Sequence, residues 1–252
     1  MKILLTNDDG IFADGIGALA RVLAEKRHKV YLVAPDRERS ASGHSITIIN
    51  PIRAREIEME KIKAFKVNGT PADCVKLGLE RLISDKIDLV ISGINDGVNL
   101  AYDILYSGTV SAAIEAYIMG YNSIAISMER GENKNFEEAA LFLEKFIKNN
   151  DFGEYQDKIL LNINYPNLIN SKLKGLKICR LSKSPYEDVF EERVDPFKQK
   201  YYWLTGGINR KEKLDDTDIW ALANKYISIT PLKIELDNID LIKKMKSKIS
   251  LY

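Results

Sequence analysis

The first 35 residues constrain the fold of this chain most strongly. Residues 2–6 form a short apolar run with the length and composition of a fully buried strand. Residues 15–26 then carry apolar side chains at helical spacing, and residues 29–34 form a second apolar strand. A strand, a helix and a strand in this order predict two parallel strands joined by a right-handed crossover.

The rest of the chain continues this alternation. Apolar runs predict further strands over residues 46–49, 64–67, 87–91, 122–128, 158–163 and 226–231. Helical spacing predicts further helices over residues 70–83, 107–119, 136–148 and 240–248. The charged stretch between the strands at 46–49 and 64–67 is expected to form an exposed hairpin or sheet edge. We therefore predict an α/β fold, in which helices flank a Rossmann-like, mostly parallel sheet.

Residues 183–217 break the pattern. They mix charges and turns with the aromatic residues Tyr186, Phe190, Phe197, Tyr201, Tyr202 and Trp203. This composition predicts a protruding hairpin or arm, used for subunit contact or for covering a site. We expect an α/β core over residues 1–182. Residues 183–252 should add the arm, the last strand and a helix to the same structural unit.

Composition excludes several classes of protein. The 252 residues carry a formal net charge of +1, so no global basic field favours a nucleic acid polymer or an anionic membrane. No apolar segment approaches the roughly 20 residues that cross a bilayer. Cys74 and Cys179 are too few for a disulfide framework or a zinc knuckle. Because Lys2 already belongs to the first strand, we expect no leader peptide and a cytoplasmic location.

Polar residues follow the first strand directly: Asn7, Asp8, Asp9 and Gly10. In open parallel sheets, ligands bind just beyond the carboxyl ends of the strands. Two adjacent carboxylates repel each other, and a divalent cation is the simplest compensation. A solvated turn is the alternative, because Asn, Asp and Gly are ordinary turn residues. These residues alone leave both interpretations open.

Two other predicted strand ends are also polar. The segment after residue 34 contains Ser40 and His44, and the segment after residue 91 contains Asn95 and Asn99. The Ser40 hydroxyl and the Asn95 amide oxygen can bind a hard cation, although a plain surface loop is the commoner fate of such a stretch. A lone histidine such as His44 is more often structural than catalytic. The dinucleotide fingerprint G-x-G-x-x-G is absent after the first strand.

A predicted helix start adds donors for an anion. Ser107 is a good N-cap, and Gly108 and Thr109 follow with open backbone N–H groups, although plain capping explains these residues equally well. With Asp8 and Asp9, the three strand ends supply an all-oxygen set that suits Mg²⁺ or Mn²⁺ rather than zinc. A carboxylate-bound divalent ion beside a phosphate cradle is what hydrolysis of a phosphate ester requires.

Six motifs in this order resemble the SurE (survival protein E) family. They are Asn7-Asp8-Asp9-Gly10, residues 34–40 (APDRERS), residues 69–74 (GTPADC), Ser92-Gly93-Ile94-Asn95, Tyr106-Ser107-Gly108-Thr109-Val110 and Ser228-Ile229-Thr230-Pro231. The resemblance covers most of the chain, and the shared order makes it specific.

The resemblance implies one divalent ion per subunit, Mg²⁺ or Mn²⁺, held by Asp8, Asp9, Ser40 and Asn95. It also implies hydrolysis of nucleoside 5′- and 3′-monophosphates, some action on short polyphosphate, and a homodimer or tetramer built partly by exchanged C-terminal arms. One departure is visible: the family's Gly-Pro-Asn is here Gly97-Val98-Asn99. We expect a looser loop at Val98 rather than a lost site.

The expected mechanism is in-line attack by water on phosphorus, with Asp8 and Asp9 as anchors of the ion and one of them orienting or deprotonating the water. Asn7, Asn99, Ser107, Gly108 and Thr109 are the candidate phosphate-binding residues. A covalent mechanism with Asp8 as nucleophile is a rival, although the usual spacing there is D-x-D. A nucleotide-binding regulatory module without turnover and a metal-stabilised structural protein are alternatives from other classes.

Overall fold

A computed structural model describes the chain except for residues 60–61, 133, 169–171, 184–188, 207–211 and 249–252. One nine-stranded sheet forms its centre, with the strand order β3-β4-β2-β1-β5-β6-β7-β11-β8. The bounds of these strands are β1 (Lys2–Thr6), β2 (Lys29–Pro35), β3 (Ala54–Met59), β4 (Ile62–Val67), β5 (Leu89–Asp96), β6 (Ser123–Met128), β7 (Leu160–Tyr165), β8 (Leu176–Ile178) and β11 (Ile227–Pro231).

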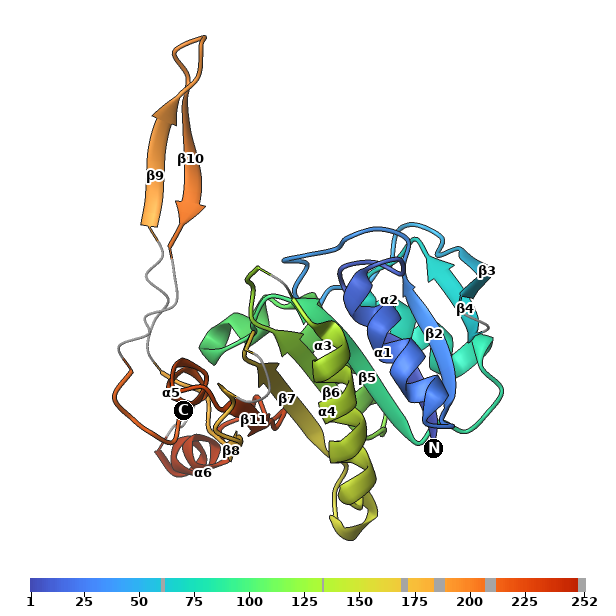
Figure 1. The fold of residues 1–252 in the computed structure, drawn as a ribbon. Coiled ribbons are helices and arrows are strands. Elements are labelled where there is room, and N and C mark those ends of the chain that lie inside the picture. Colours follow the sequence, from blue (N-terminus) through green and yellow to red (C-terminus); the bar gives the residue numbers. More distant parts are fainter. Residues whose placement is uncertain (60–61, 133, 169–171, 184–188, 207–211, 249–252) are drawn as a thin grey trace.

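Most of this sheet is parallel. Strands β4, β2, β1, β5, β6 and β7 pair in parallel, whereas β3 and β11 are antiparallel to their neighbours β4 and β7. The parallel strands share one carboxyl edge. The predicted α/β fold with a mostly parallel, helix-flanked sheet is therefore confirmed (Figure 1).

Helices cover both faces of the sheet. Helices α1 (Asp14–Glu25) and α4 (Phe136–Asn149) pack on one face, and α2 (Pro71–Leu77) and α3 (Gly108–Ile118) pack on the other. Strand β1 shows why: Ile3 and Leu5 point to the first layer, whereas Leu4 points to the second. Because successive side chains of a strand alternate between faces, a strand covered on both sides must be apolar throughout.

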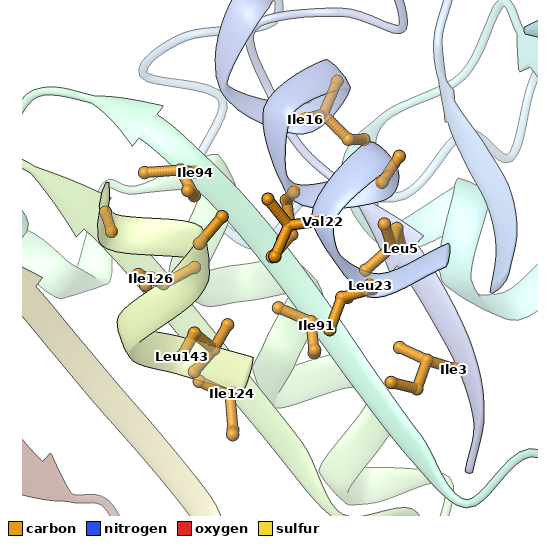
Figure 2. Close-up of a cluster of buried hydrophobic side chains, with 14 of the residues drawn as sticks. Ile3, Leu5, Ile16, Val22, Leu23, Ile91, Ile94, Ile124, Ile126 and Leu143 are labelled. Carbon is orange, nitrogen blue, oxygen red and sulfur yellow. The ribbon is translucent and has the colours of Figure 1, made fainter. Parts of the chain in front are cut away.

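The larger core lies between the sheet and the α1–α4 layer. Figure 2 shows Ile16, Val22 and Leu23 of α1 and Leu143 of α4 above isoleucines from three neighbouring strands. Each of these four helical side chains is at most 2% exposed. This packing fixes the strand ends, and therefore the loops at the carboxyl edge, relative to one another.

The strand predicted at residues 46–49 is wrong. These residues form no regular structure, and Ile48 and Ile49 are 79% and 94% exposed. The edge strand is instead β3, within the charged stretch expected to form a hairpin or edge, and it pairs antiparallel with β4. Pairing and burial decide strand formation more than local composition does, which is why a charged, alternating segment takes the edge position.

Several boundaries also differ. Strand β5 runs on to Asp96, with a register shift between Ser92 and Asn95, so Asn95 lies within the strand. The helix predicted over residues 70–83 is α-helical only to Leu77 and continues as a π-helical turn, Gly78–Leu82. The short strand β8 and helix α5 (Asp218–Ala223) were not predicted, because each is too short for a periodic signal.

The C-terminal part holds a hairpin and a helix. Strands β9 (Val189–Val194) and β10 (Lys200–Thr205) form a two-stranded hairpin that projects far from the body, as predicted (Figure 1). Helix α6 (Ile239–Lys248) matches the predicted C-terminal helix. Tyr186, expected in the arm, lies outside the described residues. Among the described helices, all are too short or too polar to cross a membrane.

Candidate active site

The polar strand ends meet in one pocket of about 480 Å³ at the carboxyl edge of the sheet. Its lining comes from the segments after β1, β2 and β6, from the end of β5 and the residues that follow it, and from the residues before α3. The lining residues are Asp8, Asp9, Ser40, Ala41, Asn95, Asp96, Gly97, Val98, Asn99, Asp103, Tyr106, Ser107, Glu129 and Arg130. All four candidate metal ligands are therefore brought together.

Asp8 is the more buried of the two adjacent carboxylates. It is 4% exposed, and the hydroxyl of Thr109 donates a hydrogen bond to its Oδ1. Burial raises the pKa of Asp8 from 3.8 to about 6, the Thr109 hydrogen bond opposes this shift, and the charge of Asp9 adds to it. The carboxylate thus lacks enough solvation or positive charge to ionise as readily as it would in water.

The first residue of α3 packs directly against Asp8. A Cβ atom at Gly108 would lie 2.8 Å from the Cβ and 2.9 Å from the Oδ2 of Asp8, closer than real contacts allow. Only glycine therefore permits the end of β1 to approach the N-terminus of α3. That terminus carries partial positive charge, which favours a carboxylate beside it.

Asp9 is half-buried, and its Oδ2 accepts a hydrogen bond of 3.2 Å from the backbone N–H of Asp96. Burial raises the pKa of Asp9. The backbone hydrogen bond opposes this, the charges of Asp96 and Glu38 add to it, and the charge of Arg130 opposes it. Both carboxylates are thus held in a setting that disfavours their charged forms, which a bound cation would relieve.

Ser40 and Asn95 supply neutral oxygens. The exposed Ser40 hydroxyl donates to Oε1 of Glu38 at 2.6 Å, so its oxygen lone pairs remain open to a cation. The Nδ2 of Asn95 donates to the carbonyl oxygen of Gly97 at 2.7 Å. This bond fixes the orientation of the amide and leaves its Oδ1 to act as an acceptor.

The donor set fits a hard divalent ion. Within the part of the chain that the structure describes, no group of three His, Cys, Asp or Glu side chains is arranged to hold a metal. An ion in this pocket would rest on two carboxylates, two neutral oxygens and water. Mg²⁺ and Mn²⁺ accept such a set, whereas structural zinc sites use His and Cys.

The candidate phosphate-binding residues fall into two groups. Ser107 and Asn99 line the pocket, and Ser107 also caps α3 by accepting a hydrogen bond from the N–H of Val110. Asn7, Gly108 and Thr109 are buried. In the structure, the hydroxyl of Thr109 donates to Asp8, and the Nδ2 of Asn7 donates to the Gly10 carbonyl at 2.8 Å. Contact between these three residues and a phosphate stays a prediction.

A buried amide network holds the Asn99 loop. The N–H of Asn99 donates to Oδ1 of Asn164 at 2.8 Å, and its Nδ2 donates to the hydroxyl of Ser127 at 2.7 Å. The Asn99 carbonyl accepts hydrogen bonds from the side chains of Asn162 and Asn164.

Val98 stands where the family has proline. Its side chain packs against a small cluster that includes Leu100 and Ile219. On the other side of Val98, the N–H of Gly97 donates to the carbonyl of Met128 at 2.9 Å, so the loop is anchored on both sides of Val98.

Sequence reasoning missed five charged or aromatic lining residues: Asp96, Asp103, Tyr106, Glu129 and Arg130. Glu129 and Arg130 directly follow the strand predicted over residues 122–128, so the rule used for the other strand ends applies to them as well. His44 lies outside the pocket lining, with its Nε2 2.7 Å from Oε2 of Glu115.

Comparison with known proteins identifies the family. The sequence model for "Survival protein SurE" matches residues 3–188. This chain belongs to the SurE family. A protein named 5′-nucleotidase SurE from Kosmotoga olearia is 47% identical over 250 residues, covering 99% of this chain and 98% of its own length. One of the same name from Petrotoga mobilis is 45% identical, covering 98% of each chain. The crystal structure of the SurE protein from Aquifex aeolicus aligns with a TM-score of 0.86 at 40% identity, covering 98% of this chain and 99% of that one.

Proposed function

We propose that this SurE-family protein is a 5′-nucleotidase that hydrolyses nucleoside monophosphates to nucleoside and phosphate with a divalent metal ion. The observation that carries the proposal is the pair of adjacent carboxylates, Asp8 and Asp9, which line one pocket with Ser40 and Asn95 and whose pKa values are raised mainly by burial. The names of the relatives, 5′-nucleotidase SurE, support the substrate class.

In this proposal, Asp8, Asp9, Ser40 and Asn95 hold one Mg²⁺ or Mn²⁺ ion. The ion supplies charge neutralisation at the phosphate and a lowered pKa for the attacking water. Asp8, buried and fixed by Thr109, anchors the site. Asp9 is the less buried carboxylate, and it orients the water and takes its proton.

Neutral donors at the start of α3 orient the phosphate. Ser107 and Asn99 line the pocket, and their side chains carry a hydroxyl and an amide NH₂ that can donate hydrogen bonds. The backbone N–H groups of Gly108 and Thr109 add the helix dipole, and Asn7 shapes the turn that presents Asp8. This assignment makes Asp8 a ligand rather than a nucleophile, because the adjacent pair Asp8-Asp9 departs from the D-x-D spacing that is usual for a covalent aspartyl-phosphate mechanism.

The proposal includes activity on 3′-monophosphates and short polyphosphate, because the contacts assigned here are all with the phosphate group and none is with the rest of the nucleotide. It also includes a homodimer or tetramer. The projecting hairpin supports this, because its side chains Phe190, Tyr202 and Trp203 are exposed in the single chain, and contact with a second subunit would bury them. The two cysteines are free thiols, which supports a reducing, cytoplasmic setting.

The test is phosphate release from a panel of nucleoside 5′- and 3′-monophosphates by protein stripped with EDTA. We expect no activity without metal, restoration by Mg²⁺ or Mn²⁺, and loss of the restored activity in Asp8→Asn. The proposal would be contradicted by activity that remains without metal and is unchanged in Asp8→Asn. Nucleotide binding without turnover would favour the regulatory module instead.

The stereochemical course at phosphorus separates the two chemical mechanisms. A single in-line attack by water inverts the configuration of a phosphoryl group made chiral with oxygen isotopes. An aspartyl-phosphate on Asp8 that water then hydrolyses needs two in-line displacements, so net retention would show the covalent mechanism.

A further inference from the structure

One cation lines the otherwise acidic pocket. Among the described lining residues, the carboxylates are Asp8, Asp9, Asp96, Asp103 and Glu129, whereas Arg130 is the one Lys or Arg. A single divalent ion would leave this lining with excess negative charge. A phosphate monoester is itself a dianion near neutral pH, so its binding requires further positive charge within the pocket.

Arg130 is held in place through only one of its nitrogen atoms. Its Nε donates to the backbone carbonyl of Asp96 at 2.9 Å, directly beside Asn95. Within the described residues, this is the one hydrogen bond that the guanidinium makes with protein. The two Nη groups therefore keep their donors for a ligand. A guanidinium presents such donors as a planar fork that matches two oxygens of a phosphate.

The backbone below Arg130 is shaped to receive it. Gly97 has a φ of +138°, and a Cβ atom there would lie 3.1 Å from the Nε of Arg130. A side chain at residue 97 would crowd the guanidinium of Arg130, and the positive φ there favours glycine. The neighbouring cation, Lys134, pairs with Oδ2 of Asp96. Asp96 is therefore already compensated and does not capture the charge of Arg130.

The phosphate-binding residues predicted from the sequence include no positively charged side chain. The Thr109 hydroxyl is bonded to Asp8, and Gly108 packs against the same carboxylate. Ser107 and Asn99 supply neutral donors only. Charge-assisted hydrogen bonds are roughly twice as strong as neutral ones, so a guanidinium at the pocket adds what these donors lack.

We propose that Arg130 is a substrate-binding residue that contacts the phosphate group of the ester through its two Nη groups. The proposal rests on the proposed phosphatase function and assigns a residue that the sequence motifs do not contain. It predicts that replacing Arg130 lowers kcat/KM for every phosphomonoester, whatever its leaving group. The same replacement should change the affinity for the metal ion little.

The test uses the full-length protein with Arg130→Gln and Arg130→Lys, and with Arg55→Gln as the matched control. Arg55 is an exposed arginine on the edge strand β3. Three quantities are measured for each protein: Mn²⁺ affinity by calorimetry, inhibition by inorganic phosphate, and kcat/KM for a nucleoside monophosphate and for p-nitrophenyl phosphate.

For Arg130→Gln we expect kcat/KM to fall roughly 10- to 100-fold on both substrates, the range for losing charge-assisted hydrogen bonds. Inhibition by phosphate should weaken by a similar factor, while Mn²⁺ affinity changes less than about threefold, as for remote surface changes. Arg130→Lys should fall between wild type and Arg130→Gln, and Arg55→Gln should match wild type.

Three outcomes would overturn the proposal: unchanged kcat/KM and phosphate inhibition, a loss confined to the nucleotide, or a loss that follows Mn²⁺ affinity. The second would place Arg130 at the nucleoside, and the third would place it in the metal site. If wild type with Mn²⁺ hydrolyses no phosphomonoester, the proposed function fails first. In that case, calorimetric titration of the Mn²⁺-loaded proteins with inorganic phosphate replaces the inhibition assay, and unchanged phosphate affinity in Arg130→Gln would rule out the proposed role of Arg130.

Discussion

Replacing Asp8 by Asn should stabilise the metal-free protein while abolishing its response to metal. The side chain is 4% exposed, and its pKa in the folded state is raised from 3.8 to about 6. This difference of about 2 pKa units corresponds to about 3 kcal/mol of unfavourable free energy in the charged form. The Oδ1 of Asn at this position can still accept the Thr109 hydrogen bond.

The sign follows from proton linkage. A carboxyl group whose pKa is higher in the folded state binds protons more tightly there, so its stabilising contribution is complete below pH 4 and is lost as pH rises through about 6. The benefit of Asp8→Asn should therefore be small at pH 4 and nearly complete at pH 8. For a chain of this size, about 3 kcal/mol corresponds to roughly 6–12 °C in Tm.

The assay is thermal unfolding of EDTA-treated protein from pH 4 to pH 8, with and without Mn²⁺. Wild type should gain stability from Mn²⁺, since an ion that binds only the folded state shifts the equilibrium, and Asp8→Asn should not. Asp240→Asn, which changes an exposed carboxylate in α6, is the control and should follow wild type. A lower Tm for metal-free Asp8→Asn at pH 8, or a gain that does not depend on pH, would refute the reasoning.

Three further predictions follow from the same contacts. Gly108→Ala places a Cβ atom 2.8 Å from that of Asp8, so it should cost about 1–3 kcal/mol in stability and weaken Mn²⁺ binding, as measured by denaturant unfolding and calorimetry. Gly17→Ala in α1 is the control and should do neither, because its Cβ atom would meet only Met59, at an ordinary contact distance of 3.7 Å. Asp218→Asn replaces one of the two buried carboxylate oxygens that accept from the N–H groups of Ala101 and Ser182, so one of these N–H groups loses its acceptor. The change should cost about 1–3 kcal/mol and raise KM through the Asn99 loop, and an unchanged KM would contradict that link. Trp203→Ser on the exposed hairpin should reduce the oligomer mass measured by light scattering without changing the Tm of the body, and an unchanged mass would remove the hairpin from the interface.

Much of the fold could be predicted because buried parallel strands and amphipathic helices have strong local signatures. In strand β1, Ile3, Leu4 and Leu5 are apolar and fully buried, since both faces of the strand are covered. The failure at residues 46–49 has the opposite cause. A short apolar run gives the same local signal whether it is buried or exposed, and only the pairing of β3 with β4 decides which segment forms the edge.

Local sequence patterns were enough to show which polar residues end the strands, and therefore that Asp8, Asp9, Ser40 and Asn95 share one edge of the sheet. They did not show that Asp8 is the more deeply buried carboxylate, or that Arg130 lines the same pocket. Both of these properties depend on tertiary contacts. How deeply an atom is buried, and which charges surround it, depend on neighbours that come from distant parts of the chain. Here these neighbours include the first turn of α3 and the segment after β6.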